Sequence, residues 1–261
     1  MKVVPKYADS DTLQIEHDGI VEFQMFDHNL VRSVDSCRKL CDAETIMYHL
    51  PFGMHNILYY LHPSTRPELL DMVAHLEPGK EFIVAHAEVT LNIFEKMGGY
   101  ELLEECSGII YLENSIAMPT GYDFSVDSAW QIAEIAGVPT VCDLVHLQAT
   151  EYLYGVRQTV PADCRYFHFA ACLDKDGVRD KPKTHGRRHR CYEDILWDMQ
   201  YLRERGATLE DAAVCTEISE TDYVNRPDMN QELEWLRKYA RDTYESGVGA
   251  RAGSRPLNFN K

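Results

Sequence analysis

Six imidazole and carboxylate side chains recur along the chain, each at or near the end of a short apolar run: His49, His86, Glu113, Asp143, His168 and Glu217. Imidazole and carboxylate are metal ligands, and mixed N and O ligation without thiolate suits Zn, Mn, Fe or Co better than Mg or Ca. Bare carboxylates crowded into one space raise each other's pKa, and a divalent cation removes that cost. These residue types therefore predict a metal site, provided that the fold brings them together.

The runs that carry these residues are predicted to be β-strands. We expect eight strands, at 2–5, 20–26, 45–50, 82–86, 108–113, 139–143, 165–170 and 212–217. Helix-like stretches lie between them, at 33–43, 66–76, 125–136, 191–205 and 229–245 among others. Alternating strands and helices indicate a parallel sheet covered by helices. Eight repeats predict an α/β protein with a single (β/α)8 TIM barrel over residues 1–246, followed by a C-terminal tail at 247–261.

A barrel would explain why the polar residues end the strands. The carboxyl ends of all strands in such a barrel meet at one mouth, where these enzymes keep their chemistry. An open doubly wound sheet is the alternative, but it often carries a glycine-rich phosphate loop, and the chain has no GxGxxG motif or P-loop. Six ligands also exceed the three or four that one catalytic zinc takes from protein, which favours two metals with a carboxylate between them.

Other polar residues fit structural roles better. A single histidine or carboxylate at a strand end is often only a hydrogen-bonded loop residue, and it is the series of six that favours ligation. Glu22 stands in mid-strand and is expected to be a satisfied core carboxylate. Glu232 and Glu234 are expected on a solvated helix face. His28 and His55 follow strands and are weaker candidates for the lining of the mouth.

The charge balance restricts the class of partner. The 26 basic and 42 acidic residues give a net charge of −16, which disfavours nucleic acid, because affinity there depends on Lys and Arg meeting phosphates. A small-molecule substrate, a sugar or a phosphoester, is expected instead. One basic run, KPKTHGRRHR at 181–190, stands out.

The location of the protein is also predicted from composition. No apolar run approaches the roughly 18 residues that span a bilayer, and we expect no membrane association. Eight cysteines without a CxxC pair suit a reducing compartment. We therefore expect a soluble cytoplasmic protein, and an oligomer is compatible with the sequence.

One local motif is more specific. Asp143-Leu-Val-His146 ends the sixth expected strand, with Glu113 before it and His168 after it. This pattern resembles the xylose-isomerase-like TIM barrel superfamily, which includes AP endonucleases and sugar phosphate isomerases and epimerases. The matching stretches are YHLPF, IVAHAE, IYLENS, VCDLVH, YFHFA and VCTEIS.

The resemblance implies roles for individual residues. Four of them match the ligands of the mononuclear isomerases and epimerases: Glu113, Asp143, His168 and Glu217. In those enzymes the two glutamates also take and return a proton at a sugar carbon, and His146 would contact a substrate hydroxyl.

The multinuclear branch of the superfamily adds further ligands. His49 and His86 match two of these, Glu113 would then bridge two metals, and His146 would help to hold a third. The third site usually needs an Asp-x-His pair after the seventh strand, which this chain lacks. Asp180 stands there instead, followed by His185 and His189 in the basic run, and His185 could serve.

Three reactions remain open at this point. The first is isomerisation or epimerisation of a sugar, polyol or sugar phosphate, with Glu113 and Glu217 as the acid/base pair and with Lys183, His185 and Arg187 as substrate contacts. The second is hydrolysis of a phosphoester by two metals, as in AP endonucleases. The third is oxidation by a multi-iron centre. Acidity and short loops favour the first reaction, which we rank narrowly ahead, and the two extra histidines favour the second. In each case the expected cofactor is one to three divalent ions of Zn, Mn or Fe.

Overall fold

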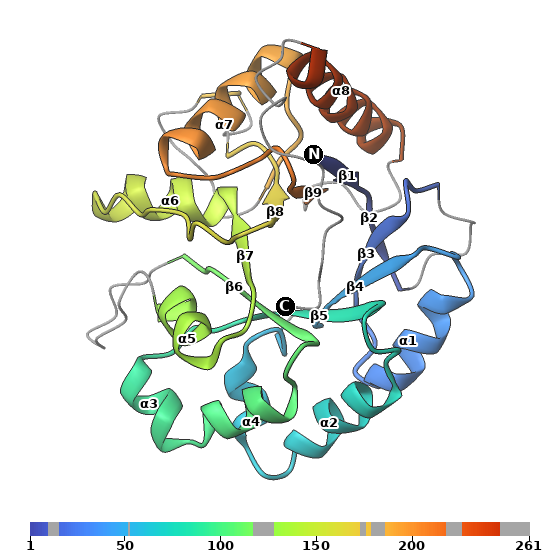
Figure 1. The fold of residues 1–261 in the computed structure, drawn as a ribbon, viewed down its shortest axis with the longest axis vertical. Helices are drawn as coiled ribbons and strands as arrows, with labels where there is room; N and C mark the ends of the chain where they lie inside the picture. The colour runs from blue at the N-terminus through green and yellow to red at the C-terminus, as the bar shows by residue number, and fades with distance from the viewer. Residues whose placement is uncertain are drawn as a thin grey trace. The chain divides into compact units, whose positions relative to one another are not determined.

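The computed structural model describes residues 1–9, 16–51, 53–116, 128–172, 176–178, 186–217 and 226–245. Strands and helices alternate along the chain, and the strands form one nine-stranded sheet in the order β1-β9-β8-β7-β6-β5-β4-β3-β2 (Figure 1). Neighbours such as β3 and β4, or β8 and β9, pair in parallel. This order confirms the predicted α/β class and the single (β/α)8 barrel.

The chain divides into two compact units, whose boundaries fall at Pro5 and within β7. The N-terminal unit comprises residues 6–141, and the C-terminal unit comprises residues 1–5 together with the described residues from 142 onward. Each unit is described separately below. The predicted tail at 247–261 lies outside the described residues.

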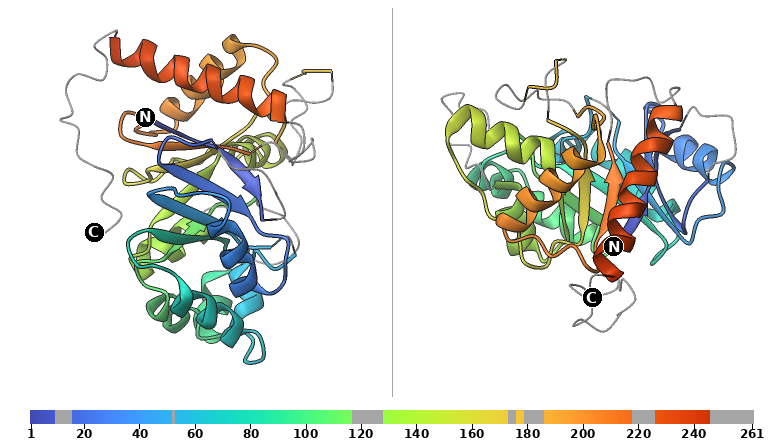
Figure 2. Two further views of the ribbon diagram at one scale, coloured as in Figure 1. Left: turned by 90° about the vertical axis from the view of Figure 1, so that its right-hand side faces the viewer. Right: turned by 90° about the horizontal axis from the view of Figure 1, so that it is seen from above.

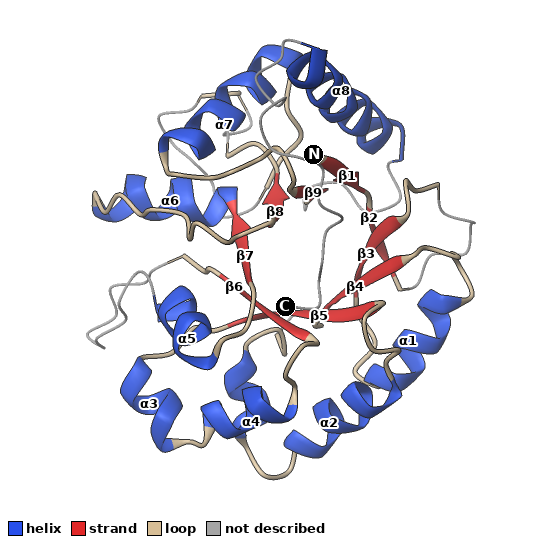
Figure 3. Ribbon diagram, in the orientation of Figure 1, coloured by secondary structure: helices blue, strands red, loops and turns tan. Residues whose placement is uncertain are grey.

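The N-terminal unit carries six strands or parts of strands. Its elements are β2 (Lys6–Ala8), β3 (Ile20–Gln24), α1 (Leu30–Arg38), β4 (Thr45–His49), the 3-10 helix η1 (Ile57–Leu61), α2 (Arg66–His75), β5 (Glu81–His86), α3 (Leu91–Lys96), α4 (Gly99–Glu105), β6 (Ile110–Glu113), α5 (Ser128–Ala136) and the first half of β7 (Thr140–Asp143). Helices α1, α2 and α4 lie on one side of β3 to β6 (Figure 3). The strands are buried throughout, as expected when both faces of a parallel sheet are covered.

Strand register sets the positions of the candidate ligands in this unit. Gln24 of β3 stands opposite His49 of β4, and His86 of β5 stands opposite Glu113 of β6. Val84 stands opposite His49 and lies two residues before His86. Because side chains alternate between the two faces of a strand, His49, His86 and Glu113 share one face of the sheet.

The C-terminal unit is built in the same way. It contains β1 (Lys2–Val4), the second half of β7, α6 (Leu144–Tyr154), β8 (Tyr166–Phe169), α7 (Tyr192–Glu204), β9 (Ala213–Thr216) and α8 (Arg226–Glu245). Helices α7 and α8 pack side by side, and α8 also contacts β1 (Figure 2). His168 of β8 stands opposite Cys215 of β9.

Two of the differences from the prediction have local causes. The single strand expected at 2–5 is two short strands, because Pro5 interrupts it: β1 pairs with β9, and β2 pairs with β3. Proline has no N–H to donate and is tolerated only where a ladder is broken. Helix α1 begins earlier than predicted, because the Asn29 side chain accepts a hydrogen bond from the Arg32 N–H and caps it.

The structure describes all eight cysteines. All eight are free thiols, and all but Cys41 and Cys191 are buried. In the part of the chain that the structure describes, no helix has both the length and the apolar character needed to cross a membrane.

Candidate metal centre

Three predicted ligands meet within the N-terminal unit. His49, His86 and Glu113 are the last residues of β4, β5 and β6, and all three side chains are buried. One oxygen, Glu113 Oε2, lies 3.1 Å from His49 Nε2 and 3.2 Å from His86 Nε2. The two Nε2 atoms are 3.4 Å apart. Neighbouring strands thus bring two imidazoles and one carboxylate oxygen to a single point.

The hydrogen bond of His49 Nδ1 indicates that a cation is needed between His49 Nε2 and the Glu113 carboxylate. His49 Nδ1 lies 3.1 Å from the Leu50 carbonyl oxygen, which can only accept, so Nδ1 carries the hydrogen. In the neutral ring Nε2 is then a lone-pair acceptor, and it faces the Glu113 carboxylate. Acceptors that face one another in a buried space need a cation between them, either a proton or a metal ion. Metal-bound histidines commonly donate their second N–H to a backbone carbonyl in the same way.

The spacing of the three atoms also fits a metal ion. Ligand atoms that each lie roughly 2.0–2.2 Å from a tetrahedral or octahedral ion are separated by about 3.0–3.5 Å. The observed separations of 3.1, 3.2 and 3.4 Å fall in that range. The set of two nitrogens and one oxygen suits zinc, manganese or iron.

A second group of possible ligands lies beside His49, His86 and Glu113, and the sequence analysis rated its member His55 only as a weaker candidate. Ligand atoms of His55, His86 and Glu88 lie within 4.8 Å of one another. The His55 ring meets the edge of the His86 ring, with centroids 4.5 Å apart. Burial, and the neighbouring His86 and His49, lower the pKa of His55 to about 4, so the ring stays neutral. Glu88, which accepts a hydrogen bond from Ser115, ends the stretch IVAHAE, but the sequence analysis did not single it out as a ligand.

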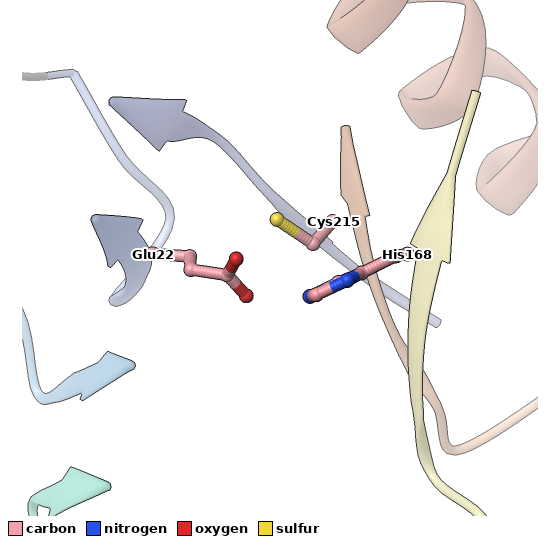
Figure 4. Close-up of side chains that lie close together, drawn as sticks. All are labelled: Glu22, His168 and Cys215. Carbon is pink, nitrogen blue, oxygen red and sulfur yellow. The ribbon is translucent and has the colours of Figure 1, made fainter. Parts of the chain in front are cut away.

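The C-terminal unit holds the other three predicted ligands. Asp143 ends β7, His168 lies in β8, and Glu217 directly follows β9. Each offers a ligand atom within 4.8 Å of the others, and His168 Nδ1 lies 2.7 Å from Glu217 Oε2. Figure 4 shows the His168 ring beside Cys215 of the neighbouring strand. This group again combines imidazole and carboxylate in a largely buried place.

Asp143 has a second role in the local structure. It is the N-cap of α6, and its Oδ1 accepts a hydrogen bond of 2.7 Å from the His146 backbone N–H. Its other oxygen, Oδ2, lies 3.9 Å from His146 Nδ1. The Asp-x-x-His motif is therefore a strand end joined to the first turn of a helix, and it holds the half-buried His146 beside the carboxylate.

The basic run is described only in part. Lys183 and His185, two of the predicted substrate contacts, lie outside the described residues, as does Asp180. Arg187 is half-buried, and its backbone forms a bridge with Ala171, just beyond β8, through hydrogen bonds of 2.7 and 2.9 Å. A Cβ on Gly186 would meet the Glu217 carbonyl oxygen at 2.4 Å. This loop thus packs directly against the backbone of a predicted ligand.

Two predictions about acidic residues have opposite outcomes. Glu22 of β3, labelled in Figure 4, is a core carboxylate as predicted, and its partner is the buried Lys6 at 2.8 Å. The prediction that Glu232 lies on a solvated helix face is wrong. Glu232 is buried and binds His189. The buried histidine comes from a distant loop, which helical periodicity alone does not indicate.

Comparison with known proteins supports the fold. No protein-family model matches the chain, and no curated protein matches its sequence. The structure is similar to the crystal structure of a xylose isomerase domain-containing protein from Salmonella typhimurium LT2, with a TM-score of 0.51 and 13% identity. The match covers 91% of this chain and 97% of that chain. The chain therefore has the xylose-isomerase-like TIM barrel fold, as the resemblance implied.

Proposed function

We propose that the protein is a metal-dependent enzyme that isomerises or epimerises a small hydroxyl-bearing substrate, such as a sugar, a polyol or a sugar phosphate. The observation that carries the metal dependence is the approach of His49 Nε2 and His86 Nε2 to one oxygen of Glu113. A fold shared with a xylose isomerase domain-containing protein agrees with this class of reaction, although fold alone does not determine chemistry.

Each ligand set has its own function in the proposal. His49, His86 and Glu113 hold metal in the N-terminal unit, and Asp143, His168 and Glu217 hold metal in the C-terminal unit. A bound divalent ion polarises a carbonyl and its neighbouring hydroxyl and so makes the adjacent proton more acidic. Glu113 and Glu217 are the carboxylates that the resemblance assigns to taking and returning that proton.

Two residues outside these sets would contact the substrate. His146, held in the first turn of α6 by Asp143, is placed to hydrogen-bond a substrate hydroxyl. Arg187, in the loop that packs against Glu217, binds an anionic group such as a phosphate. The net charge of −16 is compatible with such a substrate, because one local cation suffices for one small anion.

The second candidate is a phosphoester hydrolase. The close approach of His49 and His86 favours it, because these residues match the extra ligands of the multinuclear branch. Two ions would stabilise the attacking and the leaving oxygen of a displacement at phosphorus.

One experiment separates the two reactions. The metal-loaded protein is incubated in D2O with a panel of sugars, polyols and their phosphates. In a separate assay it is incubated with a nitrophenyl phosphodiester, whose hydrolysis releases coloured nitrophenol. An isomerase or epimerase incorporates deuterium at a substrate carbon, detected by mass spectrometry, and releases no nitrophenol. Release of nitrophenol without carbon-bound deuterium would instead support the hydrolase.

A matched pair of variants links the activity to the site. Glu217→Gln keeps the shape of the side chain but cannot take a proton, so deuterium incorporation should fall by roughly a hundredfold or more. Glu234→Gln removes a carboxylate that is exposed on α8 and should retain wild-type activity. Equal activity of both variants would contradict the role proposed for Glu217.

A further inference from the structure

A buried charged cluster in the C-terminal unit lies outside both ligand sets. The His189 ring is fully enclosed between two helices: Nδ1 contacts Glu232 Oε1 of α8, and Nε2 lies 2.9 Å from Asp198 Oδ2 of α7. The side chains of all three residues are at most 1% exposed. The ring also stacks on Phe169, the last residue of β8, with centroids 4.9 Å apart.

The geometry determines the charge on the ring. A neutral imidazole has one N–H, so one of its two carboxylate partners would face a lone pair. Only the imidazolium donates to both. Burial opposes this charge, but the carboxylates of Glu232 and Asp198 outweigh burial and raise the pKa of His189 to about 9. Gln148 of α6 donates to the second oxygen of Asp198 at 2.7 Å, which fixes that carboxylate in turn.

The cluster anchors the loop that precedes it. The His189 backbone N–H also donates to Glu232 Oε2 at 3.2 Å, so one carboxylate holds both the ring and the main chain. Two residues earlier, Arg187 exchanges backbone hydrogen bonds with Ala171. One residue before that, Gly186 fits against the Glu217 carbonyl. The loop from residue 186 to residue 189 is thus fixed at three successive places.

We propose that His189, as an imidazolium clamped between Glu232 and Asp198, is the positioning residue for this loop, and that it holds Arg187 where Arg187 binds an anionic group of the substrate. The inference rests on the proposed function, in which Arg187 contacts the substrate. It adds that the enzyme's substrate is a phosphorylated or otherwise anionic small molecule. Burying three charged groups costs desolvation free energy, and we infer that this cost is retained because the loop binds a ligand.

The first test needs no substitution. Nitrogen-15 NMR of the histidine rings in the wild-type protein should show both nitrogens of His189 protonated at pH 7, with loss of the proton near pH 9. A His189 ring that is neutral at pH 7 would overturn the proposal, since a neutral ring cannot hold both carboxylates.

The second test uses variants. Hydrogen exchange is measured at the amides of Ala171, Arg187 and His189, and the affinity for inorganic phosphate is measured by calorimetry. His189→Gln and Glu232→Gln should each speed exchange at these amides by roughly tenfold or more and weaken phosphate binding by a similar factor. Arg190→Gln, which removes the exposed guanidinium that pairs with Asp194 next to this loop, should change neither.

Metal content distinguishes failure of this inference from failure of the proposed function. Variants that fold and keep wild-type metal content, but show unchanged exchange and phosphate affinity, would overturn the role of His189. A wild-type protein that binds metal but no phosphate would overturn the anionic substrate. A wild-type protein that binds no metal would overturn the proposed function, whatever the exchange data show. If His189→Gln does not fold, Glu232→Gln and the NMR measurement still decide the matter.

Discussion

The Nε2 atoms of His49 and His86 lie 3.4 Å apart at the ends of neighbouring strands, and both face the same oxygen of Glu113. If Nδ1 of a neutral His49 ring donates to the Leu50 carbonyl, Nε2 and the Glu113 carboxylate are both acceptors, and neither can supply a proton to the other. In the proposed function, a metal ion bound between these acceptors takes the place of the missing proton.

Two substitutions of Asp143 should separate its function as a metal ligand from its function as a helix cap. Asn keeps an oxygen that can accept the His146 N–H, whereas Ala removes it. Asp143→Asn should therefore weaken metal binding by roughly tenfold or more with little change in stability, because the anionic ligand is lost and the cap remains. Asp143→Ala should weaken metal binding and also cost about 1 kcal/mol of stability. Metal titration and urea unfolding measure the two effects, and equal stability of both variants would exclude the capping role.

Gly186 should not tolerate a side chain. A Cβ there would lie 2.4 Å from the Glu217 carbonyl oxygen and 2.6 Å from Ala170 Cβ, so the backbone must move. We expect Gly186→Ala to cost roughly 1–3 kcal/mol of stability and to weaken metal binding by displacing Glu217. Adding Ala170→Gly removes only the second clash, so it should not restore metal binding. Full restoration would show that packing against Ala170, and not against Glu217, is what matters.

Much of this arrangement follows from the sequence. The six candidate ligands could be assigned to strand ends because apolar runs and their terminal polar residues are local features. The break at Pro5 and the capping of α1 by Asn29 also have local causes, and both could have been predicted. Helix α6 carries apolar residues on all sides, so no amphipathic pattern marked it.

Long-range partnerships are what the sequence does not reveal. Lys6 and Glu22 are 16 residues apart and His189 and Glu232 are 43 apart, and only the fold brings each pair together. A charged residue in a strand or helix looks the same in sequence whether it meets water or a buried partner. The prediction that Glu232 lies on a solvated helix face was wrong for this reason.

The Lys6–Glu22 pair should show strong energetic coupling. The two residues stand directly opposite each other in β2 and β3, and neither is exposed. Lys6→Met leaves a buried carboxylate without its cation and should cost roughly 3–5 kcal/mol. The double variant Lys6→Met, Glu22→Leu should recover most of that loss. Urea unfolding of the single and double variants measures the coupling, and simple additivity would contradict a buried ion pair.

The pH dependence of stability should include a contribution from Glu81. Burial raises the pKa of this carboxyl, but hydrogen bonds from Arg38, the Glu77 N–H and Tyr48 outweigh burial and lower it overall. A lowered pKa gives stability that is present above the unfolded value of about 4.3 and is lost as the pH falls through the folded value. We expect Glu81→Gln to cost roughly 2 kcal/mol at pH 7 and less at pH 4. A constant difference between the two pH values would contradict this.

The most direct test of the central claim is the metal content of the protein, purified without chelator and without an affinity metal and measured by mass spectrometry. The wild-type protein should carry Zn, Mn or Fe. The double variant His49→Ala, His86→Ala should lose about one ion per chain, because it removes two of three ligands from one set. The control His17→Ala, His62→Ala removes two imidazoles elsewhere and should keep the full content. If the double variant has the same metal content as the wild type, His49 and His86 are not ligands. If the wild-type protein holds no metal under any condition, the proposed metal-dependent function is contradicted.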